Sequence, residues 1–260
     1  MLDPKIRQRL SRISRDYDED DFVCAPEDGV MRGLDEVIPG QEHVFEGGKL
    51  FVCRRQVEHF RPEEEEQIAS CIEELHHRDC KPEKVLFVDI ETCGLWNNPI
   101  FLIGVMALKG GQVWVEQYFA RDYSEEAALL AYFAERALGY GLLVTFNGKS
   151  FDLPYIMDRM ILHRLGQTFR QEHLDLLIPA RKKYRGTLPN CRLQTLEQYV
   201  CGRRRFGDTP GALIPELYHA FVRTGNAAPL DGIFHHNALD LITMAELLPH
   251  LGEPRVESAE

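Results

Sequence analysis

The sequence lacks the features of a metal-thiolate or disulfide-bonded protein. It contains seven cysteines, an odd number, and no two of them form a Cys-x-x-Cys pair. Because structural zinc and iron–sulfur sites need closely spaced ligands, we expect neither, and we expect the cysteines to be reduced thiols. They are Cys24, Cys53, Cys71, Cys80, Cys93, Cys191 and Cys201.

Long hydrophobic runs are also absent. No stretch of about 18 consecutive apolar residues occurs, so a membrane-spanning helix is not expected. Residues 1–21 are charged along their length and lack the apolar segment of a signal peptide. We therefore expect a cytoplasmic protein with no membrane partner, whose oligomeric state the sequence leaves open.

Positive charge is scarce over the chain as a whole. The 30 Lys and Arg residues face 41 Asp and Glu residues, a net charge of −11, which argues against a protein that coats nucleic acid nonspecifically. Residues 170–205 are the exception, with nine basic residues against three acidic ones. A basic run is often only a solvated face, but in so acidic a chain we interpret this one as a strip that faces phosphates. Its basic residues are Arg170, Arg181, Lys182, Lys183, Arg185, Arg192, Arg203, Arg204 and Arg205.

The order of apolar runs predicts an α/β protein. Three runs joined by short turns, at 85–88, 101–108 and 113–119, predict an antiparallel three-strand meander. Later runs at 142–146 and 174–177 predict two further strands. Helices are expected at 62–76, 124–138, 153–165, 193–200, 214–222 and 234–248.

The length of 260 residues fits a domain of ordinary size that carries an N-terminal extension. We expect residues 1–80 to form this extension and to pack on the main domain. A short strand-like run lies within it at 50–53. Residues 81–252 would then form the main domain, and residues 253–260 a tail.

The segment most informative about chemistry is the end of the first predicted strand, where Asp89 and Glu91 follow an apolar run. Side chains two residues apart on a strand point to the same face, so the two carboxylates would lie side by side. Like charges at a buried strand end repel each other, and such a pair is usually found beside a cation or with one member protonated. The alternative is a strand end that reaches solvent, with both acids hydrated.

Two later segments supply further acids. A polar turn after the run at 142–146 leads to Asp152 at the start of a helix. In a late helix Asp240 follows His236 by four residues, so both can project from one face. Taken alone, Asp152 would be an ordinary helix cap and Asp240 an ordinary surface acid. The ordered set of four acids is what favours a catalytic carboxylate cluster.

Three motifs resemble those of the DEDD 3′-to-5′ exonucleases: Asp-x-Glu-Thr from Asp89, Asn-Gly-Lys-Ser-Phe-Asp from Asn147, and His-x3-Asp from His236. The resemblance is closer to the YprB-type branch of that superfamily, and it covers most of the chain. The string His-Leu-Asp-Leu-Leu-Ile-Pro-Ala-Arg at 173–181 and the string Leu-Pro-Asn-Cys-Arg-Leu at 188–193 are also similar to that branch.

This resemblance implies a ribonuclease-H-like fold, with a mixed five-stranded sheet in which parallel strands join the antiparallel meander and helices flank both. It also implies that a histidine near the last aspartate is the general base. Relatives have either tyrosine four residues before that aspartate or histidine five before it, whereas this chain has His236 and His235 there. The His-Asn-x-x-Asp string favours His236, and His235 stays open as the alternative. The implied ligands of two cations, Mg2+ or Mn2+, are Asp89, Glu91, Asp152 and Asp240.

The expected activity is a two-metal hydrolysis of phosphodiester bonds that starts from a 3′ end. DNA is favoured over RNA as the substrate, and repair is the favoured role. We expect the partner to be nucleic acid, single-stranded or at a 3′ end, and a helicase is a candidate protein partner. The candidate substrate-binding residues are Thr92, Asn147, Lys149, Ser150, Arg181, Lys182, Lys183 and Arg185.

Three other functions stay open. An endonuclease on the same fold would cut internally, a phosphatase would act on small nucleotides, and an inactive module would only bind nucleic acid. The His-x3-Asp helix favours the exonuclease over the endonuclease, and the basic segment argues against the phosphatase. An inactive module would lack at least one of the four carboxylates, and all four are present.

Overall fold

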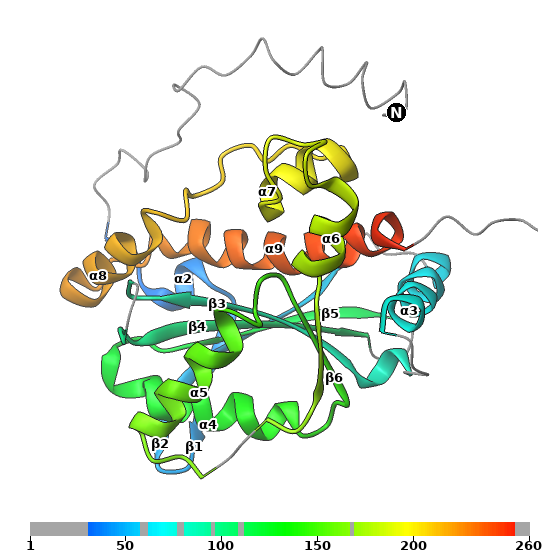
Figure 1. The fold of residues 1–260 in the computed structure, drawn as a ribbon. Coiled ribbons are helices and arrows are strands. Elements are labelled where there is room, and N and C mark those ends of the chain that lie inside the picture. The colour runs from blue at the N-terminus through cyan, green and yellow to red at the C-terminus, as the bar shows by residue number, and fades with distance from the viewer. Residues whose placement is uncertain are drawn as a thin grey trace, which may run out of the picture.

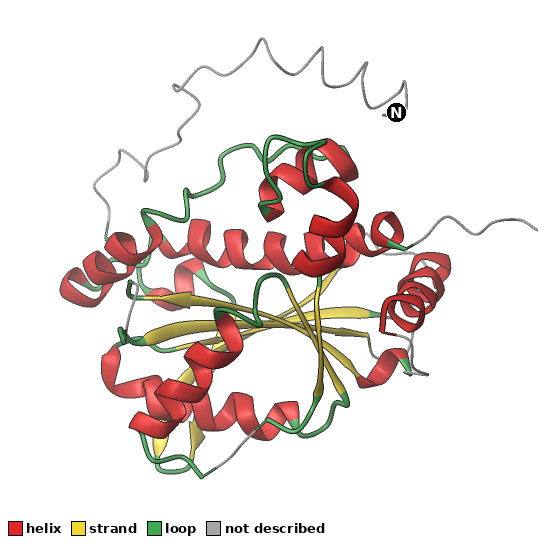
Figure 2. Cartoon of the chain, in the orientation of Figure 1, coloured by secondary structure: helices red, strands yellow, loops and turns green. Residues whose placement is uncertain are grey.

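The computed structural model describes residues 31–57, 62–76, 81–94, 97–108, 112–166 and 169–252. Within them a mixed sheet of seven strands runs through the centre of the molecule, in the order β1-β2-β5-β4-β3-β6-β7 (Figure 1, Figure 2). The strands are β1 (Gly40–Phe45), β2 (Gly48–Val57), β3 (Val85–Thr92), β4 (Ile100–Leu108), β5 (Val113–Phe119), β6 (Leu142–Thr145) and β7 (Glu172–Asp175).

Strands β3, β4 and β5 form the predicted meander. β3 pairs antiparallel with β4, and β4 pairs antiparallel with β5, which confirms that prediction. Every residue of β4 is buried, because helices cover both faces of the sheet at this strand. β3 also pairs in parallel with β6, and β6 pairs in parallel with β7. The carboxyl ends of β3, β6 and β7 therefore meet at one end of the sheet.

The sheet is two strands wider than the predicted five. β1 and β2 form a hairpin whose turn residues, Glu46 and Gly47, have φ values of 48° and 80°. Two-residue hairpin turns of this kind need positive φ at both positions. β2 then pairs antiparallel with β5, so residues 40–57 belong to the central sheet rather than only packing on it. The predicted domain boundaries otherwise stay a prediction, and the predicted tail at 253–260 lies outside the described residues.

The helices agree with the predicted ones in most places. Two predictions were wrong in detail: the helix expected at 193–200 is a single helical turn followed by a π-helical turn, and the strand expected at 174–177 ends at Asp175, where an unpredicted helix soon begins. The helices are α2 (Leu34–Val37), α3 (Pro62–His76), α4 (Glu126–Ala137), α5 (Asp152–Leu162), α6 (Leu177–Tyr184), α7 (Leu193–Leu196), α8 (Ile214–Thr224) and α9 (Leu230–Leu251), with short turns η1 (Pro82–Lys84), η2 (Tyr123–Glu125) and η3 (Glu197–Cys201).

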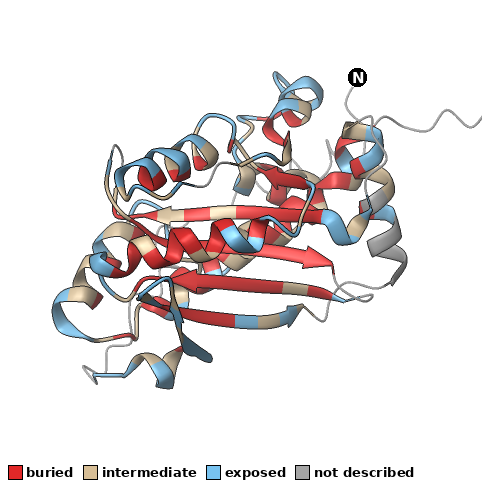
Figure 3. Ribbon diagram, turned by 90° about the horizontal axis from the view of Figure 1, so that it is seen from below, coloured by how far each residue is buried: buried red, intermediate tan, exposed pale blue. Residues whose placement is uncertain are grey.

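Helices lie on both faces of the sheet. The long helix α9 crosses one face, with α6, α7 and α8 on the same side, and α4 and α5 lie on the other side (Figure 1). Buried residues are concentrated on the strands and on the helix sides turned toward them (Figure 3). In β3, Leu86 packs in the cluster that contains Phe133 of α4, and Phe87 packs in the cluster that contains Leu241 of α9. Strand alternation then turns the carboxylates at 89 and 91 toward α9.

Helix α9 approaches β4 closely at Gly104. A β-carbon at this position would lie 2.0 Å from Oδ1 of Asn237, far closer than nonbonded atoms approach each other. The buried side chain of Asn237 fills this space. Glycine at position 104 is therefore what allows α9 to bring its polar residues to the end of β3.

Two expectations drawn from absences can be compared with the structure. The cysteines at 53, 71, 93, 191 and 201 are free thiols, whereas Cys24 and Cys80 lie outside the described residues. Among the helices that the structure describes, none combines the length and the apolar character needed to cross a membrane. The cytoplasmic location stays a prediction.

Replacement of Gly104 by alanine is expected to destabilise the protein by about 1–3 kcal/mol, because the added methyl group overpacks against Asn237. Gly141→Ala is the matched control, since a β-carbon at 141 would have no atom within 4 Å and the backbone there does not need glycine. Chemical denaturation measures both variants. Equal stability of the two would contradict the close approach of α9 to β4.

Candidate active site

Four carboxylates from three separate elements converge beside α9. Asp89 and Glu91 lie at the end of β3, Asp152 is the first residue of α5, and Asp240 lies in the middle of α9. Burial, together with the negative charges of Asp240, Glu91 and Asp152, raises the pKa of Asp89 well above its usual value. The fold thus brings together the acids that the sequence motifs had singled out.

Asp89 is held by a chain of amide hydrogen bonds. Asn237 Nδ2 donates to Asp89 Oδ2 at 2.8 Å, and Gln117 Nε2 donates to Asn237 Oδ1 at 2.9 Å. Gln117 Nε2 also donates to the carbonyl of Phe234, 2.7 Å away. The side-chain donors of β5 and α9 therefore fix the orientation of one carboxylate oxygen of Asp89.

Glu91 is the carboxylate with the fewest partners. Within the ranges that the structure describes, no side chain or backbone group donates a hydrogen bond to it. Burial raises the pKa of Glu91 to about 8; the charge of His236 opposes this rise, whereas those of Asp240 and Asp152 add to it. A partly buried carboxylate without a donor beside other acids is the environment expected of a cation ligand.

Asp152 is positioned by the loop between β6 and α5. Asp175, at the end of β7, accepts hydrogen bonds from the backbone N–H groups of Asn147 and Lys149, at 2.8 Å and 3.0 Å. The turn is tight, since a β-carbon at Gly148 would lie 2.2 Å from Oγ1 of Thr145. Burial raises the pKa of Asp152 to about 7, although backbone hydrogen bonds oppose the rise.

The two candidate histidines have different surroundings. His236 is buried, its Nδ1 lies 3.0 Å from both carboxylate oxygens of Asp208, and its Nε2 lies 3.7 Å from Oδ2 of Asp240. Burial lowers the pKa of His236, but the hydrogen bond with Asp208 and the charges of Asp240 and Glu91 outweigh it and raise this pKa to about 9. His235, by contrast, is exposed. The geometry therefore favours the histidine at 236.

Arg205 joins the site from the loop after η3. Its guanidinium lies 2.6 Å from Glu197, 3.0 Å from Asp208 and 2.5 Å from Oδ1 of Asp240. Arg203 pairs with the same glutamate at 2.7 Å. This end of the basic run at 170–205 is therefore bound to internal carboxylates, so the interpretation of the whole run as one phosphate-facing strip was wrong here.

The donor set fits hard divalent cations. Carboxylate oxygens are the ligands that Mg2+ and Mn2+ prefer, and the raised pKa values show negative charge that the protein's own cations only partly offset. Among the described residues, no group of three or more His, Cys, Asp or Glu side chains is arranged as a metal-ion site as it stands. One oxygen of Asp240 is occupied by Arg205. The residues that could hold cations are Asp89, Glu91, Asp152 and Asp240.

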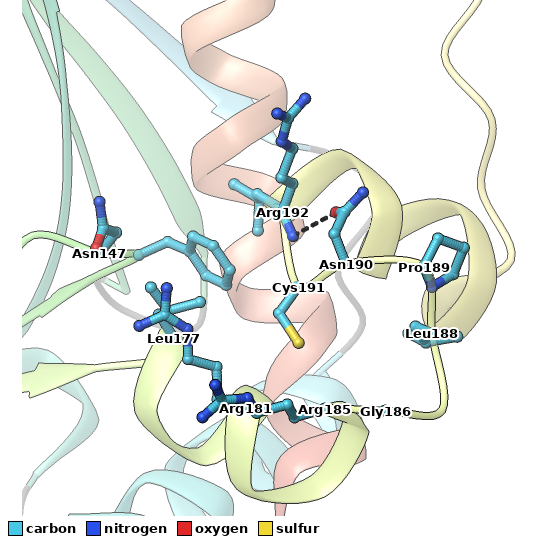
Figure 4. A pocket seen from close by; sticks show the side chains of 12 residues that line it. Asn147, Leu177, Arg181, Arg185, Gly186, Leu188, Pro189, Asn190, Cys191 and Arg192 are labelled. Carbon is cyan, nitrogen blue, oxygen red and sulfur yellow. Dashed lines mark hydrogen bonds between the residues drawn. The ribbon is translucent and has the colours of Figure 1, made fainter.

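The predicted substrate-binding residues divide into four groups. Thr92 is buried and its hydroxyl donates to the carbonyl of Gly94 at 2.8 Å, which makes it part of a turn. On α6, the lysines at 182 and 183 line a different hollow from the arginines, beside the end of α9. Lys149 and Ser150 are exposed on the loop before Asp152, whereas a separate pocket is lined by Asn147, Arg181 and Arg185 (Figure 4).

Sequence reasoning missed the roles of Asp208 and Glu197, and it counted Arg205 only as part of the strip that faces phosphates. None of these residues belongs to the quoted motifs. Asp208 and Arg205 act through partners distant in the chain, His236 and Asp240, whereas Glu197 pairs with the nearby arginines at 203 and 205. The one available signal was local: Arg205 and Asp208 are opposite charges three residues apart beside Gly207. This spacing alone does not indicate that they contact an active site.

The fold and the carboxylate cluster define an α/β protein of the ribonuclease-H-like type. A family model described as the RNase_H superfamily matches residues 86–252. The chain therefore belongs to the RNase H superfamily, which confirms the resemblance seen in the motifs.

The known proteins that are similar to this chain include a bacterial protein and an archaeal polymerase. The uncharacterized protein YprB of Bacillus subtilis (strain 168) is 34% identical over 174 residues, which make up 65% of this chain and 42% of that relative. The structure of the family B DNA polymerase from the hyperthermophilic archaeon Pyrobaculum calidifontis matches 66% of this chain and 25% of the polymerase chain, with a TM-score of 0.52 and 17% identity. The second likeness shows the fold alone. The chain thus spans less than half of either protein.

In the metal-free protein, the free energy of unfolding is expected to fall as the pH rises from about 5 to about 8. The folded-state pKa values of Glu91 and Asp152 are raised to about 8 and about 7, so these groups lose their protons at a lower pH in the unfolded chain than in the folded protein. Each rise in pH within this range therefore stabilises the unfolded state more than the folded state. His236 acts in the same direction above its unfolded pKa, because it keeps its proton in the folded state up to about 9. The contribution of these groups to the free energy of unfolding is thus fully present at low pH, and it is lost as the pH rises through their folded-state pKa values.

Urea denaturation in EDTA at a series of pH values measures this slope. Asp152→Asn removes one ionising carboxyl, so the variant is expected to show a shallower slope and to exceed the wild type in stability at about pH 8. Addition of Mn2+ at that pH should raise the stability of the wild type more than that of the variant. A profile that rises with pH would contradict the buried, mutually repelling carboxyls.

Proposed function

We propose that this protein is a metal-dependent nuclease that removes nucleotides from the 3′ end of a nucleic acid strand, with DNA as the favoured substrate and repair as its context. The observation that carries the proposal is the convergence of four carboxylates with a buried histidine at the end of β3. Membership of the RNase H superfamily supports the coarser statement, a nuclease-like fold that binds nucleic acid.

Asp89, Glu91, Asp152 and Asp240 would hold two divalent cations, Mg2+ or Mn2+. When bound, such cations supply an activated water and stabilise the leaving 3′ oxygen. The protein's own part is to hold four acids at one place against their mutual repulsion. It does so through the amide donors at 117 and 237 and through the backbone bonds that fix the loop before α5.

His236 is the proposed general base. Its Nδ1 is engaged by Asp208, so Nε2, which points toward Asp240, is the nitrogen able to take a proton from an attacking water. The carboxylate of Asp208 orients the ring and fixes its tautomer. Positive charge bound at Glu91 and Asp240 would offset the anionic charges that raise the pKa of His236, and this leaves more of the neutral ring at physiological pH.

The alternatives are weighed by the same geometry. An inactive binding module would not need a partly buried set of four acids, three of them with raised pKa values, because such a set costs stability. An endonuclease would use the same cluster, and only the pattern of its products separates the two. A helicase that supplies single strands stays part of the proposal as a candidate partner.

The test is degradation of 5′-labelled single- and double-stranded DNA and RNA with Mg2+, Mn2+ or EDTA. We expect a metal-dependent ladder that shortens from the 3′ end. The Asp89→Asn, Glu91→Gln double variant should lose at least about 1,000-fold in rate, because both changes remove cation ligands without adding volume. Internal cuts would favour the endonuclease. A wild type that binds strands and leaves all of them intact would leave the binding module as the better account.

Three single variants separate the histidines. His236→Ala should lower the rate constant of cleavage by about 100-fold or more, as expected for loss of a general base. Asp208→Asn should lower it by about 10–100-fold, because the ring loses its orienting carboxylate. His235→Ala should retain most of the activity, since this side chain is exposed. Single-turnover measurements give these rates, and a larger loss in the His235 variant would reverse the assignment.

A further inference from the structure

A pocket of about 750 Å3 lies between α6 and the loop at 186–193. Figure 4 shows Arg181 on α6 and Arg185 directly after it, with Arg192 and Cys191 on the loop. We call this the arginine pocket. Its apolar walls come from Phe146, Leu177, Leu188 and Leu193. A volume of this size is within the range of about 300–1,000 Å3 that is usual for ligand sites.

The three arginines of the pocket have no acidic partner among the residues that the structure describes. Arg181, Arg185 and Arg192 are exposed, and within the described part of the chain none forms an ion pair. The arginines at 203 and 205, in the same basic run, are by contrast bound to Glu197. Guanidinium groups recognise phosphates well, and three of them without partners at one pocket leave strong capacity for an anion.

The loop wall of the pocket has a defined shape. Asn190 Oδ1 accepts hydrogen bonds from the backbone N–H of Arg192 at 2.9 Å, drawn as a dashed line in Figure 4, and from the hydroxyl of Thr195 at 2.8 Å. Leu188 is buried and forms a bridge with Arg185 at the end of α6. The wall is therefore anchored at both of its ends.

The pocket is connected to the carboxylate cluster through Asp175. The carboxylate of Asp175 accepts hydrogen bonds from the backbone N–H groups of Asn147 and Leu177, at 2.8 Å and 3.0 Å, and both residues line the pocket. Asn147 also begins the short loop that ends at Asp152. One polar side chain thus ties the pocket wall to the segment that positions a candidate metal ligand.

We infer that the arginine pocket binds consecutive phosphates of a single nucleic acid strand next to the bond that the carboxylates hydrolyse. This inference rests on the proposed function of the neighbouring cluster. A pocket of this volume accommodates one or two nucleotides of a strand. The apolar walls, with the ring of Phe146 among them, suit an unpaired base, which binds by stacking rather than by its pairing edge.

The opposite side of α6 provides the contrast. Lys183 Nζ donates to the carbonyl of Gly252 at 2.9 Å, and the hydroxyl of Tyr184 donates to the carbonyl of His250 at 3.0 Å. Lys182 lines the same hollow as Lys183, away from the pocket. The basic residues at 181–185 therefore face two different sides. The arginines line the arginine pocket, and the lysines lie beside the end of α9.

Two double variants with the same loss of charge test the inference. Binding of a labelled oligo(dT) of about 12 nucleotides is measured in EDTA, where no cleavage occurs, over a range of salt concentrations. Arg181→Gln with Arg185→Gln should weaken binding at low salt by about 10-fold or more. The plot of log K against log salt, which has a negative slope, should become shallower by about 1.4. Lys182→Gln with Lys183→Gln should leave the slope near that of the wild type. Arg192→Gln, on the opposite wall, should make the slope shallower than that of the wild type by about 0.7.

The outcomes separate this inference from the proposed function. Equal effects of the arginine and lysine pairs would overturn it, as would a wild type that prefers duplex to single strands. If the wild type cleaves strands with metal but the arginine pair binds oligo(dT) normally, the inference fails and the proposed function stands. If no substrate is cleaved, but the arginine double variant and not the lysine one binds oligo(dT) more weakly and with a shallower salt dependence, the inference about the arginine pocket stands and the catalytic proposal fails.

Discussion

The concentration of four carboxylates in one partly buried place is the constraint on which the rest of the site depends. Burial, together with their mutual repulsion, raises the pKa values of Asp89, Glu91 and Asp152, and the repulsion would disperse the acids if they were free to move. The surroundings hold them instead. Asn237 fixes Asp89, the guanidinium of Arg205 lies against Asp240, and backbone donors oppose the rise in the pKa of Asp152. Binding of cations is the chemical outcome that this arrangement favours.

The topology of the sheet explains why the acids meet. β3, β6 and β7 are parallel neighbours, so the loops that follow them lie together at one end of the sheet, where α/β proteins commonly bind ligands. α9 then adds polar residues from the face of the sheet that it crosses. Glycine at 104 lets α9 approach closely enough for the amide of Asn237 to reach both β3 and β5. Backbone geometry, more than any single polar contact, sets the positions of the groups in the site.

The basic run at 170–205 shows how one stretch of sequence can serve several purposes. Its arginines at 203 and 205 pair with acids beside the carboxylate cluster, and its lysines lie beside the end of α9. Its arginines at 181, 185 and 192 line a pocket and form no ion pair with any residue that the structure describes. Charge counts along the chain cannot separate these uses, because a helix turns neighbouring residues to different sides and a loop can fold its charges inward.

Local patterns in the sequence determined the meander, most helices, and the acids at 89, 91, 152 and 240, because alternation, helical spacing and motif strings act over a few residues. Tertiary structure alone decided the rest. The hairpin at 40–57 joins the sheet by pairing with β5, Asp208 reaches His236 from a distant loop, and His236 is buried whereas its neighbour at 235 is exposed. Each of these depends on contacts between segments far apart in the chain, which no local pattern encodes.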